Sequence, residues 1–158
     1  MNQHVPAAPH HTYRIACDGA CNTNHIKSPF RKVGWGFTAI RSDGRTAERS
    51  GTCEGDGESN NTAELEAVIQ ALSFLQPGSN VTLLLDSNYV LKGATEWLEG
   101  WKRKGWKKAD GKPVLNLRRW QILDDLMQTR NVTFEKVKGH AGHVMNERAD
   151  ALAVAALA

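Results

Sequence analysis

Four acidic side chains of this 158-residue chain stand where they could hold a metal ion. Asp18 follows the apolar run "RIAC" and Asp86 follows "VTLLL", and both runs have the composition of strands. Glu64 opens the helical pattern "TAELEAVIQALSFL", and Asp150 lies in an Ala-rich segment near the end of the chain. An Asp that closes an apolar strand is poorly placed for burial but well placed for a site at the edge of a sheet.

Each acid taken alone also has a purely structural interpretation. Asp18 and Asp86 could be turn residues or helix caps, because Asp is common at both. Asn61 and Glu64 have the spacing of a capping box, in which the Glu reaches back to the start of its helix. Asp150 could be a solvated helix acid at the border of an apolar face. For each position alone these interpretations are favoured, so the functional interpretation depends on the acids meeting in one place.

Four carboxylates that meet at one edge of a sheet would repel one another and destabilise the fold. A hard divalent cation removes that penalty, because Mg²⁺ prefers carboxylate oxygens and keeps water positions open for a substrate phosphate. Two such ions, about 3.5–4 Å apart, can activate a water and stabilise the leaving oxygen of a phosphodiester. The acids therefore predict a metal site that acts on phosphate esters.

The segment "WLEGWKRKGWKKADGK" (97–112) concentrates the basic character of the chain. It contains three Trp, six Lys or Arg and two acids, whereas the whole chain carries a net charge of only +3. A positive patch with interleaved aromatic rings suits a nucleic acid, which offers both phosphates and faces to pack on. The alternative is a solvated amphipathic helix with its Trp side chains buried. The segment alone does not separate the two.

Composition limits the class of protein. The length predicts one domain, and 41% hydrophobic and 23% charged residues are ordinary for a globular protein. No apolar run approaches twenty residues, so no membrane span is expected. Three Cys without C-x-x-C spacing predict reduced thiols in a cytoplasmic protein. Residues 1–11 are predicted to be a flexible polar tail without signal-peptide character, and 12–158 a single domain.

The elements that must position these residues follow from periodicity and from turn and cap signals. Asp43-Gly44 predicts a hairpin turn, Ser87 and Asn146 are expected helix caps, and Gly105 is expected to break a helix in the basic segment. The order predicts an α/β fold with a mixed sheet and helices on both faces. The expected strands are 12–18, 33–42, 46–55, 81–86 and 131–137, and the expected helices are 62–75, 87–98, 116–127 and 146–158.

Together these residues carry a resemblance to a known family. The sequence resembles type 1 ribonuclease H, the bacterial form. The resemblance implies the ribonuclease H-like fold, a five-stranded mixed sheet with three antiparallel and two parallel strands, flanked by helices in the order βββαβααβα with a basic protrusion. The matching segments occur in the family's order: "CDGAC" (17–21), "SNNTAELEA" (59–67), "LLLDSNYV" (83–90), "WLEGWKRKGWKKADGKPV" (97–114) and "VKGHAGHVMNERAD" (137–150).

The resemblance also implies an activity, the endonucleolytic hydrolysis of the RNA strand of an RNA/DNA hybrid, leaving 5′-phosphate and 3′-hydroxyl ends. It implies two Mg²⁺ ions, with Mn²⁺ as an alternative, and a monomer with no obligate protein partner. His140 in "KGHAGH" matches a family histidine that shuttles protons, while His143 is expected only to shape the loop. The implied catalytic acids and metal ligands are Asp18, Glu64, Asp86 and Asp150.

The resemblance further implies contacts with the hybrid substrate. The main chain at Cys21, with Asn60 and Glu64, matches positions beside the RNA strand. Positions matched to the DNA strand and its phosphate pocket are Asn24, Ser59, Asn61, Asn88 and Trp97. Positions of the basic protrusion are Trp101, Lys102, Arg103, Lys104, Lys107 and Lys108.

Two features depart from the family pattern, and two other functions compete with the cleavage of hybrids. The loop from 22 to 32 is longer and more basic than usual, and no match is found for the phosphate-pocket arginine.

The alternative function is a catalytically inactive hybrid-binding module, which the presence of all four acids disfavours. A strand-transfer enzyme with the same sheet is also disfavoured, because such enzymes usually lack both "KGHAGH" and the basic protrusion.

Overall fold

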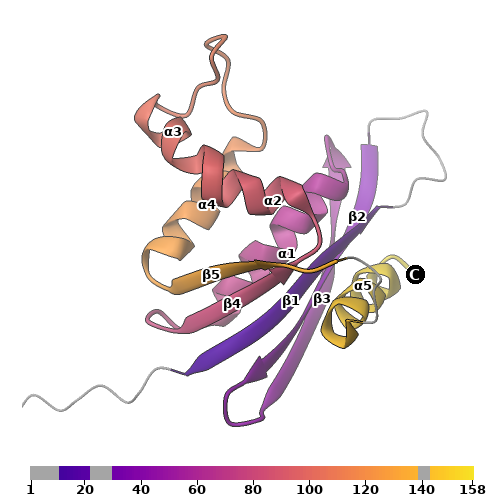
Figure 1. The fold of residues 1–158 in the computed structure, drawn as a ribbon. Helices are drawn as coiled ribbons and strands as arrows, with labels where there is room; N and C mark the ends of the chain where they lie inside the picture. The colour runs from indigo at the N-terminus through magenta and orange to yellow at the C-terminus, as the bar shows by residue number, and fades with distance from the viewer. Residues whose placement is uncertain (1–10, 22–29, 139–142) are drawn as a thin grey trace, which may run out of the picture.

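A computed structural model describes residues 11–21, 30–138 and 143–158 (Figure 1). Its strands form one five-stranded sheet in the order β3-β2-β1-β4-β5. The first three strands pair antiparallel, β4 pairs parallel with β1, and β5 pairs parallel with β4. The sheet is therefore mixed, as the sequence predicts. The strands are β1 (Thr12–Cys21), β2 (Phe30–Arg41), β3 (Thr46–Asp56), β4 (Asn80–Leu85) and β5 (Asn131–Lys136).

The first strand is longer than its predicted end at Asp18. Residues 18–21 continue the antiparallel ladder with 33–36 of β2, so Asp18 lies inside β1 and not at its end. The prediction was wrong because Gly19 and Ala20 have low strand propensity, yet the partner strand supplies hydrogen bonds at these positions. The expected hairpin turn at Asp43-Gly44 is confirmed, with Gly44 at a φ of +92°.

Helices cover the two faces of the sheet unequally (Figure 1). On one face, α1 (Asn60–Phe74) and α4 (Leu117–Gln128) enclose the larger core with side chains of the sheet. On the other face, α5 (Val144–Ala156) covers a small cluster that includes Ala149. The predicted apolar face of the first helix is confirmed, since its four members are at most 2% exposed: Leu65, Val68, Leu72 and Leu75.

The segment after β4 is one helical stretch interrupted by a π-helical turn. It runs through α2 (Asn88–Lys92), the turn η1 (Gly93–Trp97) and α3 (Leu98–Arg103). Ser87 caps α2 as predicted, its Oγ accepting from the Tyr89 N–H at 3.2 Å. The helix ends at Arg103, and the chain turns at Gly105, whose φ is +69°. The predicted break near Gly105 is confirmed.

Two predicted helix caps were wrong. In α1 the capping box joins Ser59 to Thr62, not Asn61 to Glu64, and the Thr62 hydroxyl accepts from the Ser59 N–H at 2.8 Å. Glu64 is thereby released from a capping role. In α5 the cap is His143, and Asn146 lies buried in the first turn. His143 Nδ1 accepts from the Asn146 N–H at 3.2 Å, a role that the sequence analysis did not assign.

Within the described residues, none of the helices combines the length and apolar character needed to cross a membrane.

Candidate active site

Two of the four predicted acids meet where the sheet opens between β1 and β4. The parallel pairing of these strands ends at Ala16 and Leu84, and continuing that register places Asp18 level with Asp86. Asp86 is the first residue after β4. Both acids therefore lie at the carboxyl end of the parallel pair, the edge where open α/β sheets bind their ligands.

Glu64 joins the pair from the first helix. The Gly19 N–H donates to Asp18 Oδ1 at 2.8 Å and lies 3.3 Å from Glu64 Oε1, so one backbone donor orients both carboxylates. A Cβ on Gly19 would lie 2.6 Å from both Ala63 Cβ and Glu64 N. Glycine is needed here because the start of α1 presses directly onto β1.

The three acids form a candidate metal site. One carboxylate oxygen from each of Asp18, Glu64 and Asp86 lies within 4.8 Å of the others. Asp18 and Glu64 are only 5% and 7% exposed. Glu64 Oε2 is buried, and no hydrogen-bond partner reaches it from the described parts of the chain. Buried oxygens are normally satisfied, so this oxygen fits a role as ligand of a hard divalent cation.

The electrostatics of the cluster also favour a cation. Burial raises the pKa of Asp18 to about 6, with Asp86 and Asp150 contributing to the rise, while hydrogen bonding with Glu64 and then with the Gly19 N–H opposes it. Burial, followed by the interactions with Asp18 and Asp86, raises the pKa of Glu64 well above its ordinary value. Each carboxylate is thus destabilised in its charged form, and a bound cation would reverse that effect.

The fourth acid approaches from the opposite face of the sheet. Asp150 lies in α5, half-buried, and its charge acts on Asp18. It is not one of the three residues whose oxygens lie within 4.8 Å of one another. The helix that carries it presses onto β2 at Gly34, where a Cβ would lie 2.2 Å from the Ala153 carbonyl oxygen. Asp150 therefore acts on Asp18 electrostatically but lies outside the three-residue cluster.

The predicted substrate residues of α1 and α2 surround this edge. Asn60 and Asn61 are exposed in the first turn of α1, and Asn88 is exposed at the start of α2, two residues after Asp86. The Ser59 hydroxyl accepts from the Thr62 N–H at 3.3 Å. Cys21 is half-buried at the end of β1. Asn24 and His140, both predicted site residues, lie outside the described residues.

The basic protrusion extends from the body of the molecule at α3 and the loop that follows it (Figure 1). Four of its five predicted phosphate-binding residues are exposed. Lys102 differs, because its Nζ lies 3.2 Å from Asp124 Oδ1 of α4 and 3.6 Å from Glu99 Oε1. Lys102 therefore holds the protrusion against α4. The four exposed residues are Arg103, Lys104, Lys107 and Lys108.

The two predicted tryptophans divide their roles. Trp101 packs against the core, with its ring centroid 5.2 Å from that of the fully buried Trp120. Trp97 is 39% exposed, and its ring centroid is 5.9 Å from that of Trp101. An aromatic stack thus runs from the core to the surface at the base of the protrusion, and Trp97 is its exposed end.

Sequence reasoning missed a cation beside the acids. Lys136 Nζ donates to the main-chain carbonyl of Asp86, which fixes the chain where it leaves β4. The contact follows from the pairing of β4 with β5, in which Lys136 lies beside Leu85, the residue before Asp86. Finding it requires the register of the two strands, which the sequence alone does not define.

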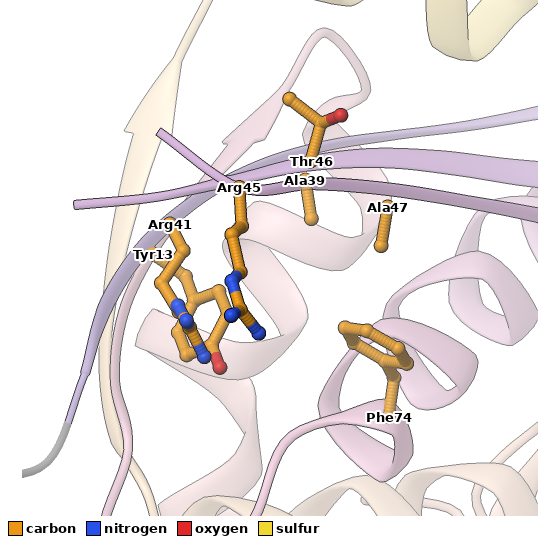
Figure 2. A pocket seen from close by; sticks show the side chains of 7 residues that line it. All are labelled: Tyr13, Ala39, Arg41, Arg45, Thr46, Ala47 and Phe74. Carbon is orange, nitrogen blue, oxygen red and sulfur yellow. The ribbon is translucent and has the colours of Figure 1, made fainter. Parts of the chain in front are cut away.

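A pocket elsewhere in the molecule has different chemistry (Figure 2). It lies beside the turn that joins β2 to β3, and none of its lining residues is acidic. Arg41, one of its two cations, donates to Asp43 at 2.9 Å through Nε. This pocket offers no carboxylate ligands and is not the candidate active site. Its lining residues are Tyr13, Ala39, Arg41, Arg45, Thr46, Ala47 and Phe74.

The fold and the acidic cluster define a class of protein, an α/β protein with a carboxylate site suited to divalent cations. Comparison with known proteins agrees. The family model described as RNase H matches residues 10–158. A curated protein named Ribonuclease H from Cyanothece sp. is 46% identical over 142 residues, which cover 89% of this chain and 85% of that protein. The chain belongs to the RNase H family.

Solved structures agree with this assignment. The crystal structure of LC9-RNase H1, described as a type 1 RNase H with the type 2 active-site motif, has a TM-score of 0.78 and 29% identity, and the match covers 94% of this chain and 73% of that one. A foamy viral protease-reverse transcriptase, solved in complex with an RNA/DNA hybrid, has a TM-score of 0.74 at 20% identity, over 92% of this chain and 20% of that one. The second likeness concerns the fold alone.

Proposed function

We propose that this chain is a ribonuclease H, an endonuclease that hydrolyses the RNA strand of RNA/DNA hybrids and leaves 5′-phosphate and 3′-hydroxyl ends. The observation that carries the proposal is the cluster of Asp18, Glu64 and Asp86, with oxygens within 4.8 Å of one another at the carboxyl edge of the sheet. Curated relatives that carry the name Ribonuclease H support it, as does the hybrid complex of a viral protein with the same fold.

The donor set favours magnesium. The ligands are carboxylate oxygens, which suit hard cations such as Mg²⁺ and Mn²⁺ better than softer metals. In this proposal Asp18, Glu64, Asp86 and Asp150 would hold two Mg²⁺ ions, and Mn²⁺ could replace them. Divalent ions bound there would supply an activated water and neutralise charge that develops on the phosphodiester.

The protein's own groups orient the acids and move protons. The Gly19 N–H fixes Asp18 and Glu64 relative to each other, and Lys136 fixes the carbonyl of Asp86. His140 is proposed to relay a proton and to assist product release, a role for which the imidazole side chain is suited.

Discrimination between the two strands is assigned to the residues around the acids. Asn60 and the main chain at Cys21 are proposed to contact the RNA strand, where the 2′-hydroxyl distinguishes RNA from DNA. The DNA strand and its phosphates are assigned to neighbouring polar and aromatic groups and to the protrusion. These residues are Asn24, Ser59, Asn61, Asn88, Trp97, Arg103, Lys104, Lys107 and Lys108.

The proposed enzyme acts as a cytoplasmic monomer. One chain provides all four acids, so the mechanism needs no partner subunit. Cys17, Cys21 and Cys53, all within the described residues, are not joined in disulfides, as expected in a reducing compartment. Light scattering coupled to gel filtration would measure the mass in solution, and a dimer would contradict this part of the proposal.

Cleavage of labelled substrates tests the proposed activity. The chain is incubated with an RNA/DNA hybrid, duplex DNA and duplex RNA, each with and without Mg²⁺, and the product ends are analysed. We expect cleavage only of the RNA strand of the hybrid, only with the metal, and with 5′-phosphate products. Tight binding to the hybrid without cleavage in either Mg²⁺ or Mn²⁺ would favour the inactive binding module.

A further inference from the structure

A partly buried ion cluster joins α4 to the start of α1, the helix that carries Glu64. Arg119 in α4 donates from its Nη2 to Glu58 Oε1 at 2.9 Å and from its Nε to Glu66 Oε1 at 3.0 Å. The three side chains are 22%, 11% and 14% exposed, respectively. Such burial makes the cluster stronger and less screened by salt than an exposed ion pair.

Glu58 and Glu66 flank the part of α1 that faces the site. Glu58 precedes the helix, Glu66 lies in its second turn, and Glu64 lies between them in sequence. Glu58 Oε2 also accepts from the Thr62 hydroxyl at 2.6 Å, and that hydroxyl belongs to the capping box of α1. Arg119 is thus connected to the first turn of α1 through one carboxylate and to the second turn through the other.

The first turns of α1 need such a support because repulsion among the acids of the site acts on Glu64, which this helix carries. Glu64 is buried beside Asp18 and Asp86, and like charges at this separation repel. When these carboxyls are ionised and no cation is bound, that repulsion favours movement of α1 away from β1. The contact at Gly19 is tight, so a small displacement of α1 would separate Glu64 from the other two acids.

We infer that Arg119 is a positioning residue that holds Glu64 and the exposed Asn60–Asn61 turn in the geometry that binds metal and hybrid. The guanidinium suits this role because its planar fork can bond two carboxylates in two directions, which a lysine ammonium does less well. The inference rests on the proposed function for its biological meaning. The contact geometry and its effect on metal binding can be tested without it.

The test is metal binding in the absence of substrate. Arg119→Met keeps the apolar stem and removes the charge, and Arg130→Met is the matched control. Arg130 donates from Nη2 to the Leu75 carbonyl at 2.7 Å, so it supports the far end of the same helix, away from the acids. The measurements are Mn²⁺ binding by calorimetry and the Mg²⁺ concentration at which the melting temperature reaches half of its metal-induced rise.

We expect both variants to melt below the wild type, but only Arg119→Met to bind metal more weakly, by roughly 10-fold, the lower end of the range for residues that orient metal ligands. Its cleavage activity should recover as Mg²⁺ is raised, whereas a merely structural defect would not respond. Wild-type metal affinity in Arg119→Met, or an equal loss in Arg130→Met, would overturn the inference.

A second variant decides the matter if Arg119→Met does not fold. Arg119→Lys keeps the charge but cannot bond both carboxylates in the same way, so its metal affinity should lie below that of the wild type. Wild-type affinity in this variant would contradict the inference. The two proposals also fail separately: a wild-type chain that cleaves no hybrid overturns the proposed function, while unchanged metal binding in the Arg119 variants overturns only the positioning role.

Discussion

Asp18 in β1 stands directly opposite Gly36 in β2, and the missing side chain of Gly36 makes room for the helix that carries the fourth acid. A Cβ on Gly36 would lie 2.7 Å from Leu152 Cβ and 3.0 Å from the Ala149 carbonyl oxygen, both in α5. Asp150 immediately follows Ala149. The same strand pair therefore positions one acid directly and a second one through the helix packed against it.

Asp18→Asn should abolish cleavage and stabilise the metal-free protein. Removing this charge takes away a proposed metal ligand and also the desolvation cost and repulsion that disfavour a buried carboxylate at this position. We expect less than a tenth of wild-type kcat/KM with Mg²⁺, a loss above ~1.4 kcal/mol of transition-state stabilisation. Unfolding free energy without metal should rise by about 1–2 kcal/mol, within the usual range for single substitutions.

The matched control for this prediction is Asp125→Asn, which changes an exposed acid of α4 that is not part of the cluster. It should leave both activity and stability close to wild type. Hybrid binding by Asp18→Asn, measured by gel shift, should persist. An Asp18→Asn variant that keeps more than a tenth of wild-type activity would remove this residue from the proposed metal site.

The stability of the metal-free protein should depend on pH through the same carboxyl groups. The pKa of Asp18 is about 6 in the folded chain against an ordinary value of 3.8, so between these values the folded state holds more protons than the unfolded state. Stability then falls as pH rises through this window, and Glu64 acts in the same direction.

This prediction is tested by the difference in unfolding free energy between the wild type and Asp18→Asn as a function of pH. Denaturant unfolding of wild type and Asp18→Asn, both without metal, should give similar stabilities near pH 4 and a growing advantage for the variant up to pH 7. Saturating Mg²⁺ at pH 7 should reverse that advantage, because only the wild type retains the full ligand set. A stability difference that is constant across this pH range would contradict the assigned pKa shift.

The two histidines of "KGHAGH" should separate into a catalytic and a structural role. His140→Ala should lower kcat by roughly 100-fold or less and flatten its pH dependence near neutrality, as expected for an assisting proton relay. His143→Ala should lower stability by about 1 kcal/mol, since its Nδ1 caps α5, and affect kcat less. The readouts are kcat at saturating hybrid and the melting temperature. A larger loss of kcat in His143→Ala would mean that the roles are reversed.

Much of the fold could be predicted because the relevant signals are local. The Asp43-Gly44 turn, the Ser87 cap and the apolar spacing of Leu65, Val68 and Leu72 each depend on a few neighbouring residues, and the structure confirms them. Asp18, Glu64 and Asp86 do come together, because the β1–β4 register brings Asp18 level with Asp86 and the start of α1 packs onto Gly19.

The features that were missed depend on partners far apart in the chain. Asp18 was placed at a strand end because its local sequence stops favouring a strand, whereas pairing with Gly36 extends β1. The contact between Arg119 and Glu58 joins residues 61 positions apart, and no periodicity encodes it. In the sequence nothing distinguishes Lys102 from the basic residues beside it, because its partner Asp124 is 22 positions away in the chain.

The last prediction concerns the basic protrusion, and the environment of Lys102 changes how it should be tested. Lys102 is held by Asp124, so its replacement would disturb the packing of α3 on α4 as well as the charge of the surface. Arg103, Lys104 and Lys107 are exposed and suit a test of charge alone. We therefore expect the triple change to Ala to weaken hybrid binding without loss of stability.

Lys and Arg bind nucleic acid largely by releasing condensed counterions, so affinity falls steeply with salt and the slope reports the number of phosphate contacts. The triple variant should lose roughly two or three contacts, and the plot of log affinity against log salt should flatten by about 0.9 for each. KM should rise while kcat changes little, because ground state and transition state lose the same binding energy.

Lys102→Ala is the control and should lower the melting temperature more than the triple variant does. An unchanged KM together with an unchanged salt slope would mean that this surface is a solvated helix end with no contact to the substrate.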